Sequence, residues 1–411
     1  MNVKSAGITT GINLGNLLSS LSVALDFNHT GLARHHRRVA HVALKIGRAL
    51  ALPDEDLRQL YCSALLHDIG AVSIWEKIAL AEFEVEDSFG HCTRGREFVT
   101  DTYLFAPLGD VIACHHDHWS GNNPSGFSRE EIPLFSRIIH LADRLDVGLE
   151  AGAGDILERR DSMFDQFRRL SGKIFDPRLV EVLGDISIRE SFWLDLEASF
   201  LPDLLQEQVG DLVTIVGPED LLGIARMFSR VIDAKSAFTY RHSALVTAIA
   251  VQLAGQLGFS EPQLQEMKVA GLLHDLGKLS IPEQILEKPG KLSPAEYNII
   301  KRHPYYTYHI LRPIEGFETI RECAAYHHER LDGRGYPFGI TAADLTLGAR
   351  VVTVADIFAA LVEDRPYRPG MTREQVTAIF ERQTNAGALD PYVVSTLLRN
   401  YTDFEALKSS R

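Results

Sequence analysis

The chain carries HDLGK at residues 274–278 and HHERLDGRGYP at residues 327–337. Each stretch places a histidine beside a second metal-binding side chain, Asp275 in the first and His328 in the second. Neutral imidazoles and carboxylates are ligands for Zn, Fe, Mn and related divalent ions. The glycines of the second stretch would let the backbone approach an anionic ligand closely. Together the two stretches predict a metal centre beside a phosphate site.

Candidate ligands in the second half of the chain lie on segments that are predicted to be separate helices. Segment 264–274 has apolar residues at helical spacing and ends at the HD pair, just before Gly277, where a helix would stop. Segment 348–362 predicts a helix that is apolar apart from Asp356, and an isolated buried carboxylate is costly unless it is paired or metal-bound. As neighbours on a helix, His327 and His328 would point about 100° apart and serve two ions more comfortably than one. The candidates are His242, His274, Asp275, His303, His327, His328 and Asp356.

The second half resembles the HD-GYP family of metal-dependent phosphodiesterases, a branch of the HD phosphohydrolase superfamily. The resemblance covers about residues 225–400 and rests on RHS at 241–243, HDLGK at 274–278, IPEQILEKPGKLSPAE at 281–296, HP at 303–304, HHERLDGRGYP at 327–337, VADIFAAL at 354–361 and DRPYR at 364–368. It implies an all-helical domain that hydrolyses a cyclic dinucleotide, chiefly cyclic di-GMP, at a binuclear or trinuclear metal centre.

The resemblance also implies a ligand set. One ion would be held by His242, His274, Asp275 and Asp356, and the other by Asp275, His303, His327 and His328, with Asp275 as the bridge. Trinuclear members carry a glutamate where this chain has Phe238, so two divalent ions (Fe, Mn or another transition metal) are expected. The usual HPxxG motif is HPYYT at 303–307 here, so the helix after His303 could pack differently.

Asp275 and Lys278 are the predicted catalytic residues. A water between two ions bridged by Asp275 would have a lowered pKa, and the resulting hydroxide would attack phosphorus in line. Lys278 lies one helical turn from His274 and would neutralise charge on the phosphate. Substrate contacts are expected from Lys278, Gly333, Arg334, Gly335, Tyr336, Arg365 and Arg368. The alternatives are a simple tight turn for the loop and surface ion pairs for the arginines.

The first half repeats the ligand pattern. His35 to His67 spans 32 residues, as does His242 to His274, and His91 to His115 spans 24, as does His303 to His327. This internal duplication assigns a possible second metal site to His35, His67, Asp68, His91, His115, His116 and Asp143. The first copy has Ala71 in place of Lys278 and lacks the GYP loop and DRPYR. We interpret it as a degenerate copy, regulatory or dimerising, whose histidines either bind metal or are relics.

Bulk properties indicate two domains in one all-α chain. A length of 411 residues exceeds what one core usually supports, and the duplication predicts domains at 1–210 and 220–411. Amphipathic stretches such as 38–50 and 243–257, without sustained two-residue alternation, predict an all-α architecture. The resemblance and the duplication imply two tandem HD-type helical bundles. A net charge of −13 argues against a duplex DNA or RNA partner or a membrane surface. Four cysteines without a CxxC pair, and no apolar run of about 18 residues, favour a cytoplasmic protein.

The sequence thus predicts a cytoplasmic phosphodiesterase of second-messenger signalling. Cyclic di-GMP and 3′,3′-cyclic GMP-AMP are both open as substrates, because tandem proteins with a degenerate HD-like first domain resemble this layout and prefer the mixed dinucleotide. One alternative is a non-catalytic module that binds the dinucleotide or a partner protein around a structural metal. Another is an HD phosphohydrolase of mononucleotides, which DGRGYP and DRPYR disfavour. A homodimer is a candidate assembly.

Overall fold

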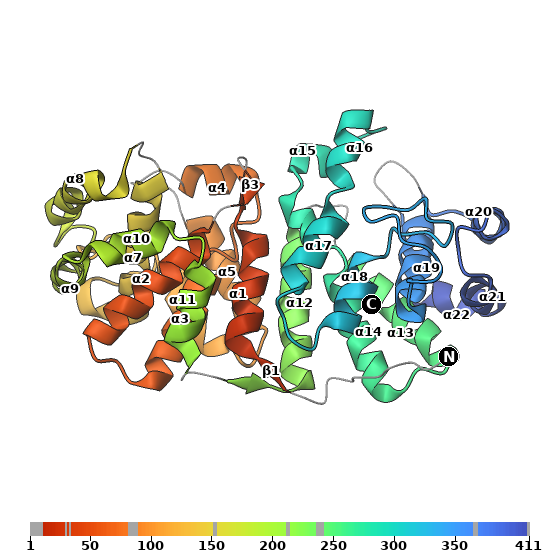
Figure 1. The fold of residues 1–411 in the computed structure, drawn as a ribbon, viewed down its shortest axis with the longest axis horizontal. Helices are drawn as coiled ribbons and strands as arrows, with labels where there is room; N and C mark the ends of the chain where they lie inside the picture. Colours follow the sequence, from red (N-terminus) through yellow and green to blue (C-terminus); the bar gives the residue numbers. More distant parts are fainter. Residues whose placement is uncertain are drawn as a thin grey trace. The chain divides into compact units, whose positions relative to one another are not determined.

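Helices make up nearly all regular structure in the computed structural model of the chain (Figure 1). The residues that it describes are 11–28, 31–32, 34–80, 89–150, 154–210, 214–235, 242–364 and 369–408. Within these ranges the strands are only two residues long: β1 (Ile12–Asn13), β2 (Phe27–Asn28), β3 (Gly31–Leu32) and β4 (Ile215–Val216). β1 pairs with β4, and β2 pairs antiparallel with β3. The predicted all-α class is confirmed.

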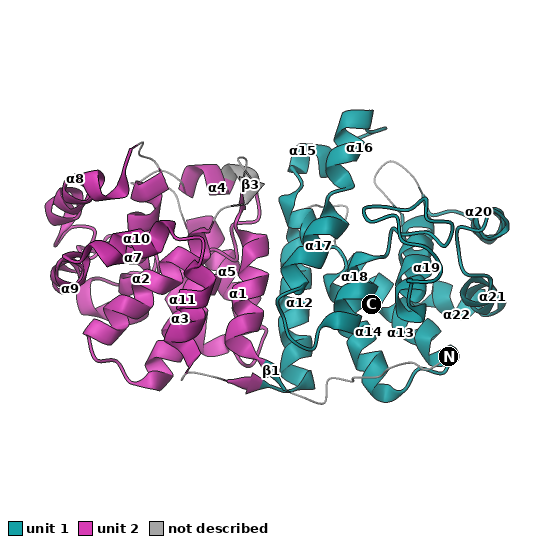
Figure 2. Ribbon diagram, in the orientation of Figure 1, with its two compact units in different colours: residues 1–12, 216–411 teal, residues 13–215 magenta. Residues whose placement is uncertain are grey.

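Figure 2 shows two compact units, residues 13–215 and residues 216–411 together with 1–12. The α-helices of the first unit are α1 (Leu14–Leu25), α2 (His35–Ala49), α3 (Asp54–Leu66), α4 (Ile74–Leu80), α5 (Phe89–Thr100), α6 (Gly109–Ala113), α7 (Leu134–Glu150), α8 (Ile156–Leu170), α9 (Pro177–Ser187), α10 (Glu190–Glu197) and α11 (Leu201–Val209). Two short 3-10 helices accompany them, η1 (Ala106–Leu108) and η2 (Arg129–Glu131).

The second unit contains α12 (Pro218–Ala234), α13 (His242–Gln256), α14 (Glu261–Leu273), α15 (Glu283–Leu286), α16 (Pro294–Ile300), α17 (His303–Leu311), α18 (Glu318–Ala325), α19 (Leu347–Val362), α20 (Arg373–Asn385), α21 (Pro391–Arg399) and α22 (Tyr401–Ala406), with the 3-10 helix η4 (Leu276–Ser280). The helices predicted over 264–274 and 348–362 correspond to α14 and α19.

Local signals explain where the central helix of the second unit begins and ends. α14 starts after Ser260, whose side chain and that of Gln263 cap each other's backbone amides in a capping box. It ends at Leu273, so that His274 and Asp275 leave the helix together. The glycine that follows is needed for packing, because a Cβ on Gly277 would lie 2.0 Å from the backbone oxygen of His303.

Packing brings three helices of each unit together in the same way. In the second unit α13 packs against α14 and α19, and in the first unit α2 packs against α3 and α7. The core of α13 is apolar, with Leu245, Val246, Ile249 and Leu253 buried, and each fully buried aliphatic side chain contributes about 1.5–3 kcal/mol. His242 is the first residue of α13, as His35 is of α2. Each trio therefore delivers its ligand-bearing residues to one place.

Among the described residues, no helix is both long and apolar enough to cross a lipid bilayer.

Candidate metal centres

One cluster in the second unit contains His242, His274 and Asp356, whose ligand atoms lie within 4.8 Å of one another. They come from the start of α13, the end of α14 and the middle of α19. The Nε2 atom of His242 lies 3.1 Å from Oδ1 of Asp356. These are three of the four residues that the resemblance assigned to the first ion, and the fourth is Asp275.

A second cluster contains His303, His327 and His328, again with ligand atoms within 4.8 Å of one another. His303 begins α17, whereas His327 and His328 lie in the turn after α18, which ends at Ala325. The expectation that the adjacent histidines share a helix and suit two ions is therefore wrong. The turn places their ring centroids 4.2 Å apart, on one side of the centre.

The carboxylate of Asp275 lies between these clusters. Its Oδ2 atom is 3.2 Å from Nε2 of His274. Its Oδ1 atom is 3.4 Å from Nε2 of His303 and 3.9 Å from Nε2 of His327. One carboxylate thus presents a separate oxygen to each cluster, which is the arrangement of a bridging ligand.

Backbone hydrogen bonds determine which ring nitrogens are free to bind metal. The Nδ1 atoms of His274, His303 and His327 lie 2.8, 2.7 and 2.7 Å from carbonyl oxygens three residues earlier. A carbonyl only accepts, so each Nδ1 carries the proton and each Nε2 presents its lone pair. The Nε2 atoms of His303 and His327 are 3.2 Å apart, and two facing lone pairs repel each other unless a cation lies between them.

These residues fit a divalent metal. Nitrogens bound to one transition-metal ion at about 2.0–2.1 Å stand roughly 3 Å apart, as these do. Nε2 of His274 and Oδ1 of Asp275 are buried atoms without a hydrogen-bond partner among the described residues. Unpartnered buried polar atoms are costly, and a bound cation would satisfy both of them.

The charge states of His303, His327 and Asp275 are those of metal ligands, whereas His242 takes up a proton. Burial lowers the pKa of His303 to about 3 and that of His327 to about 4, so both imidazoles stay neutral. Burial opposes ionisation of Asp275, but His274 and Lys278 hold the pKa of its carboxyl well below the usual range. Burial also lowers the pKa of His242, yet Asp356 and Glu363 outweigh it and raise that pKa to about 10. That side of the cluster attracts a cation.

Lys278 contacts the carboxylate between the two clusters, whereas Gly333 and Gly335 are required by the backbone conformation and packing of their loop. The Nζ atom of Lys278 is 2.5 Å from Oδ2 of Asp275. Gly333 has φ +71°, and a Cβ on Gly335 would lie 2.4 Å from the Cα of Glu329. The tight turn that was the alternative interpretation thus accounts for both glycines. Tyr336 packs its ring 4.9 Å from that of His328.

The structure gives little information on the three arginines that were predicted to contact substrate. Arg334 is exposed, and its backbone amide donates to Asp332. Arg365 and Arg368 lie outside the described residues, as does Phe238, the position that bears on a third ion.

Two residues that the sequence interpretation missed support the ligands. Oε2 of Glu363 lies 2.8 Å from Nδ1 of His242 and orients that ring. Its position seven residues after Asp356, directly after the last residue of α19, was a usable signal. The Thr307 hydroxyl accepts from the amide of Gly277 at 3.0 Å and donates to the carbonyl of His274 at 3.1 Å. The departure from HPxxG thus adds a bridge between α17 and the HD turn.

The first unit assembles the corresponding residues. His35, His67 and Asp143 form one cluster. Oδ2 of Asp68 lies 3.5 Å from Nε2 of His67, and its Oδ1 lies 3.1 and 3.3 Å from Nε2 of His91 and His115. Nδ1 of His116 lies 3.9 Å from Oδ2 of Asp143. Arg144 also donates to this oxygen at 2.7 Å, and Ala71 stands where the second copy has Lys278.

Comparisons with known proteins match both halves. A family model described as "HD domain" matches residues 226–393, and a second HD domain model matches residues 32–148. The chain is 32% identical to 3′3′-cGAMP-specific phosphodiesterase 1 of Vibrio cholerae over 98% of its own length and 96% of that protein. It is 36% identical to the cyclic di-GMP phosphodiesterase PA4108 of Pseudomonas aeruginosa over 44% of its own length and 42% of that protein.

A solved structure of a cyclic GMP-AMP specific phosphodiesterase of Vibrio cholerae, V-cGAP3, is also similar. It is 28% identical, with a TM-score of 0.69, over 96% of this chain and 98% of that one. The chain belongs to the HD-GYP family of metal-dependent cyclic-dinucleotide phosphodiesterases. Within that family it has the tandem form, with a degenerate HD-GYP-like copy ahead of the copy that has Lys278 and the GYP loop.

Proposed function

We propose that the second unit is the catalytic one and that the chain hydrolyses a cyclic dinucleotide, with 3′,3′-cyclic GMP-AMP as its preferred substrate. The observation that carries the catalytic assignment is the carboxylate of Asp275, which faces both histidine clusters and holds Lys278 at 2.5 Å. The first unit has the histidines but not the lysine.

The substrate preference rests on the tandem arrangement of two HD domains, which this chain shares with relatives that align over nearly its whole length. The relative and the solved structure that align over nearly the whole of this chain are both named for cyclic GMP-AMP. The cyclic di-GMP phosphodiesterase described above aligns with less than half of it. The simplest account is that tandem proteins of this family prefer 3′,3′-cyclic GMP-AMP as substrate. This chain has the tandem arrangement, so we expect the same substrate preference.

In the proposed mechanism, His242, His274, Asp275 and Asp356 hold one divalent ion, and Asp275, His303, His327 and His328 hold the other. When bound, two such ions supply a hydroxide nucleophile near neutral pH and offset charge on the phosphate. The backbone carbonyls that accept from Nδ1 of His274, His303 and His327 keep each Nε2 aimed at the centre.

Lys278 and Tyr336 act on the substrate in this proposal. The ammonium of Lys278 is next to the bridging carboxylate, so it is placed to stabilise negative charge that develops on the phosphate oxygens. Burial raises the pKa of Tyr336 above its usual value, so its hydroxyl stays protonated and can donate a hydrogen bond. Its ring, held against His328, borders the substrate side of the second cluster.

The first unit, proposed as a domain over 1–210 ahead of a catalytic domain over 220–411, would regulate the catalytic unit or form a homodimer. The four cysteines are buried thiols that form no disulfide, which supports the proposed cytoplasmic location because thiols persist in reducing compartments.

A product assay by liquid chromatography tests the proposal. Purified protein loaded in turn with Mn²⁺ and Fe²⁺ is incubated with cyclic di-GMP and 3′,3′-cyclic GMP-AMP, beside Asp275→Ala and the exposed control Asp344→Ala. We expect faster cleavage of the mixed dinucleotide, lost in Asp275→Ala and kept in Asp344→Ala. Faster cleavage of cyclic di-GMP would overturn the preference alone. No cleavage of either by metal-loaded protein would leave a binding module as the better account.

A further inference from the structure

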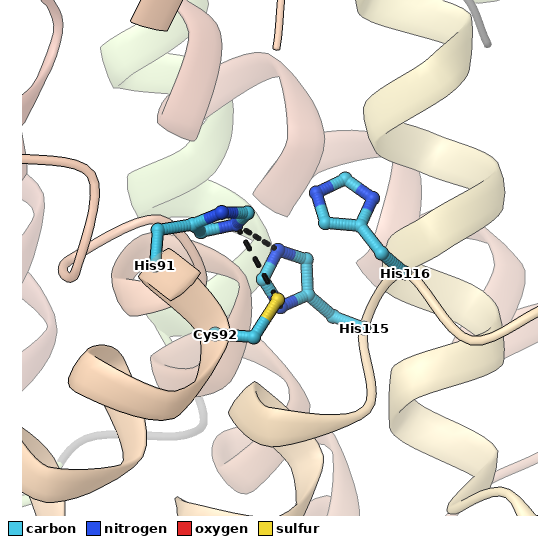
Figure 3. Close-up of side chains that lie close together, drawn as sticks. All are labelled: His91, Cys92, His115 and His116. Atoms are coloured by element: carbon cyan, nitrogen blue, oxygen red, sulfur yellow. Dashed lines mark hydrogen bonds between the residues drawn. The ribbon is translucent and has the colours of Figure 1, made fainter. Parts of the chain in front are cut away.

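A thiol lies in the second cluster of the first unit. Figure 3 shows His91, Cys92, His115 and His116, whose ligand atoms lie within 4.8 Å of one another and which are all buried. Cys92 follows His91 in α5, and the residue that follows His303 in the second unit is Pro304. The sulfur is therefore a feature of this copy alone.

The distances around the thiol match those between ligands of one ion. Sγ of Cys92 is 3.5 Å from Nε2 of His91, which is 3.3 Å from Nε2 of His115. Sulfur at about 2.3 Å and nitrogen at about 2.0–2.1 Å from a tetrahedral zinc stand roughly 3.3–3.6 Å apart. Both separations fall in this range.

The surrounding atoms are acceptors that a thiol alone does not satisfy. Nδ1 of His115 donates to the carbonyl of Ile112 at 2.6 Å, and its Nε2 lies 3.3 Å from Oδ1 of Asp68. Only a proton or a metal ion between Nε2 and this oxygen makes the contact favourable. Nε2 of His116 is buried without a hydrogen-bond partner among the described residues. The single thiol proton of Cys92 can serve only one acceptor, whereas a cation could satisfy the nitrogens and the carboxylate together.

We infer that Cys92 is a metal ligand, and that the second position of the first unit is a mixed histidine–cysteine site of the zinc type. On binding, the thiol releases its proton to solvent and a sulfur–metal bond forms. Thiolate is a soft ligand that favours zinc over the harder Mn²⁺. The second unit offers only nitrogen and oxygen ligands at the corresponding position, so the chain would hold two chemically different centres.

The mixed site is closed to solvent. The residues of the mixed site are at most 5% exposed, and the guanidinium of Arg144 occupies Oδ2 of Asp143 in the adjoining cluster. A closed site is typical of structural metal rather than catalytic metal. This inference concerns the first unit and does not require the proposed hydrolysis.

Cobalt substitution of the full chain tests the inference without relying on activity. A thiolate ligand gives Co²⁺ a near-ultraviolet sulfur-to-metal charge-transfer band, which imidazole and carboxylate ligands do not. We expect this band in the wild-type protein and in Cys62→Ser, and its loss in Cys92→Ser. Cys62 is a matched control, because it is a buried thiol of the same unit that lines a separate cavity with Leu14 and Val209. A band that persists in Cys92→Ser, or is absent from the cobalt-loaded wild type, would overturn the assignment.

A second measurement avoids the risk that Cys92→Ser fails to fold. X-ray absorption at the zinc edge of the wild-type, zinc-loaded protein should show a sulfur neighbour at about 2.3 Å. A first shell of nitrogen and oxygen only would exclude Cys92 as a ligand, whatever the chain hydrolyses.

Discussion

Replacing Gly277 by alanine tests whether the close packing of η4 on α17 positions the ligands of the catalytic centre. A Cβ at this position would lie 2.0 Å from the backbone oxygen of His303, whereas real Cβ atoms essentially never approach closer than 3.0 Å. The two segments must therefore separate by about 1 Å. Because the opposing atom belongs to the backbone, no side-chain rotation relieves the clash.

The size of the effect follows from what these segments carry. His303 is 3.4 Å from Oδ1 of Asp275, and Thr307 ties the same helix to the HD turn. A misplacement of about 1 Å in a catalytic arrangement costs roughly 100-fold in rate, and overpacking of a tight interior costs about 1–3 kcal/mol of stability. We expect Gly277→Ala to lower kcat about 100-fold and the free energy of unfolding by about 1–3 kcal/mol.

Hydrolysis of 3′,3′-cyclic GMP-AMP, bound metal per chain and urea unfolding would be measured together. Gly255→Ala is the matched control, because it lies in α13 of the same unit and its added Cβ meets nothing within 4 Å. Removing a helical glycine should there raise stability by about 0.5–1 kcal/mol and leave turnover unchanged. Wild-type turnover and metal content in Gly277→Ala would refute the argument that this contact positions His303.

Three further substitutions separate the roles of individual side chains. Lys278→Ala should retain bound metal, measured by elemental analysis, while kcat falls about 100- to 1,000-fold; loss of metal would instead make the lysine a structural partner of Asp275. Glu363→Gln should weaken metal binding about 10- to 100-fold in a titration with Mn²⁺, and unchanged affinity would contradict its role in orienting His242. Burial lowers the pKa of His41 from 6.5 to about 4. Between these two pH values the imidazole is protonated in the unfolded chain and neutral in the folded chain. The stability contributed by the neutral ring is complete above pH 6.5 and is lost as the pH falls toward 4, and His41→Leu should reduce this acid-induced loss by up to about 3 kcal/mol in urea unfolding curves.

The clustering of the candidate ligands could be anticipated from spacing, because the duplication repeats the same intervals around the same residue types. The secondary structure around the adjacent histidines was harder to predict. Whether His327 and His328 share a helix depends on where α18 ends, and no strong stop signal such as glycine or proline follows its last residue, Ala325. The class of the fold followed from helical periodicity, which is a property of each segment alone.

The side chains that orient the ligands could not be predicted by comparing the two copies. Nδ1 of His35 lies 2.9 Å from Asp146, and Nδ1 of His242 lies 2.8 Å from Glu363. Asp146 follows Asp143 by three residues, whereas Glu363 follows Asp356 by seven. The same physical requirement, an acceptor for the outer ring nitrogen, is met from different helical turns. An alignment of the copies places neither carboxylate opposite the other.

The histidines that donate to carbonyl oxygens three residues earlier also terminate helices. The carbonyls of Gly271, Ile300 and Ala324 belong to the last turns of α14, α16 and α18, and such terminal carbonyls lack partners within their own helix. In the proposed centre each imidazole would thus bind metal with one nitrogen while it caps a helix with the other. Occupancy of the centre is consequently linked to fraying of these helix ends, and chelation of the metal should accelerate amide hydrogen exchange there before the rest of the unit opens.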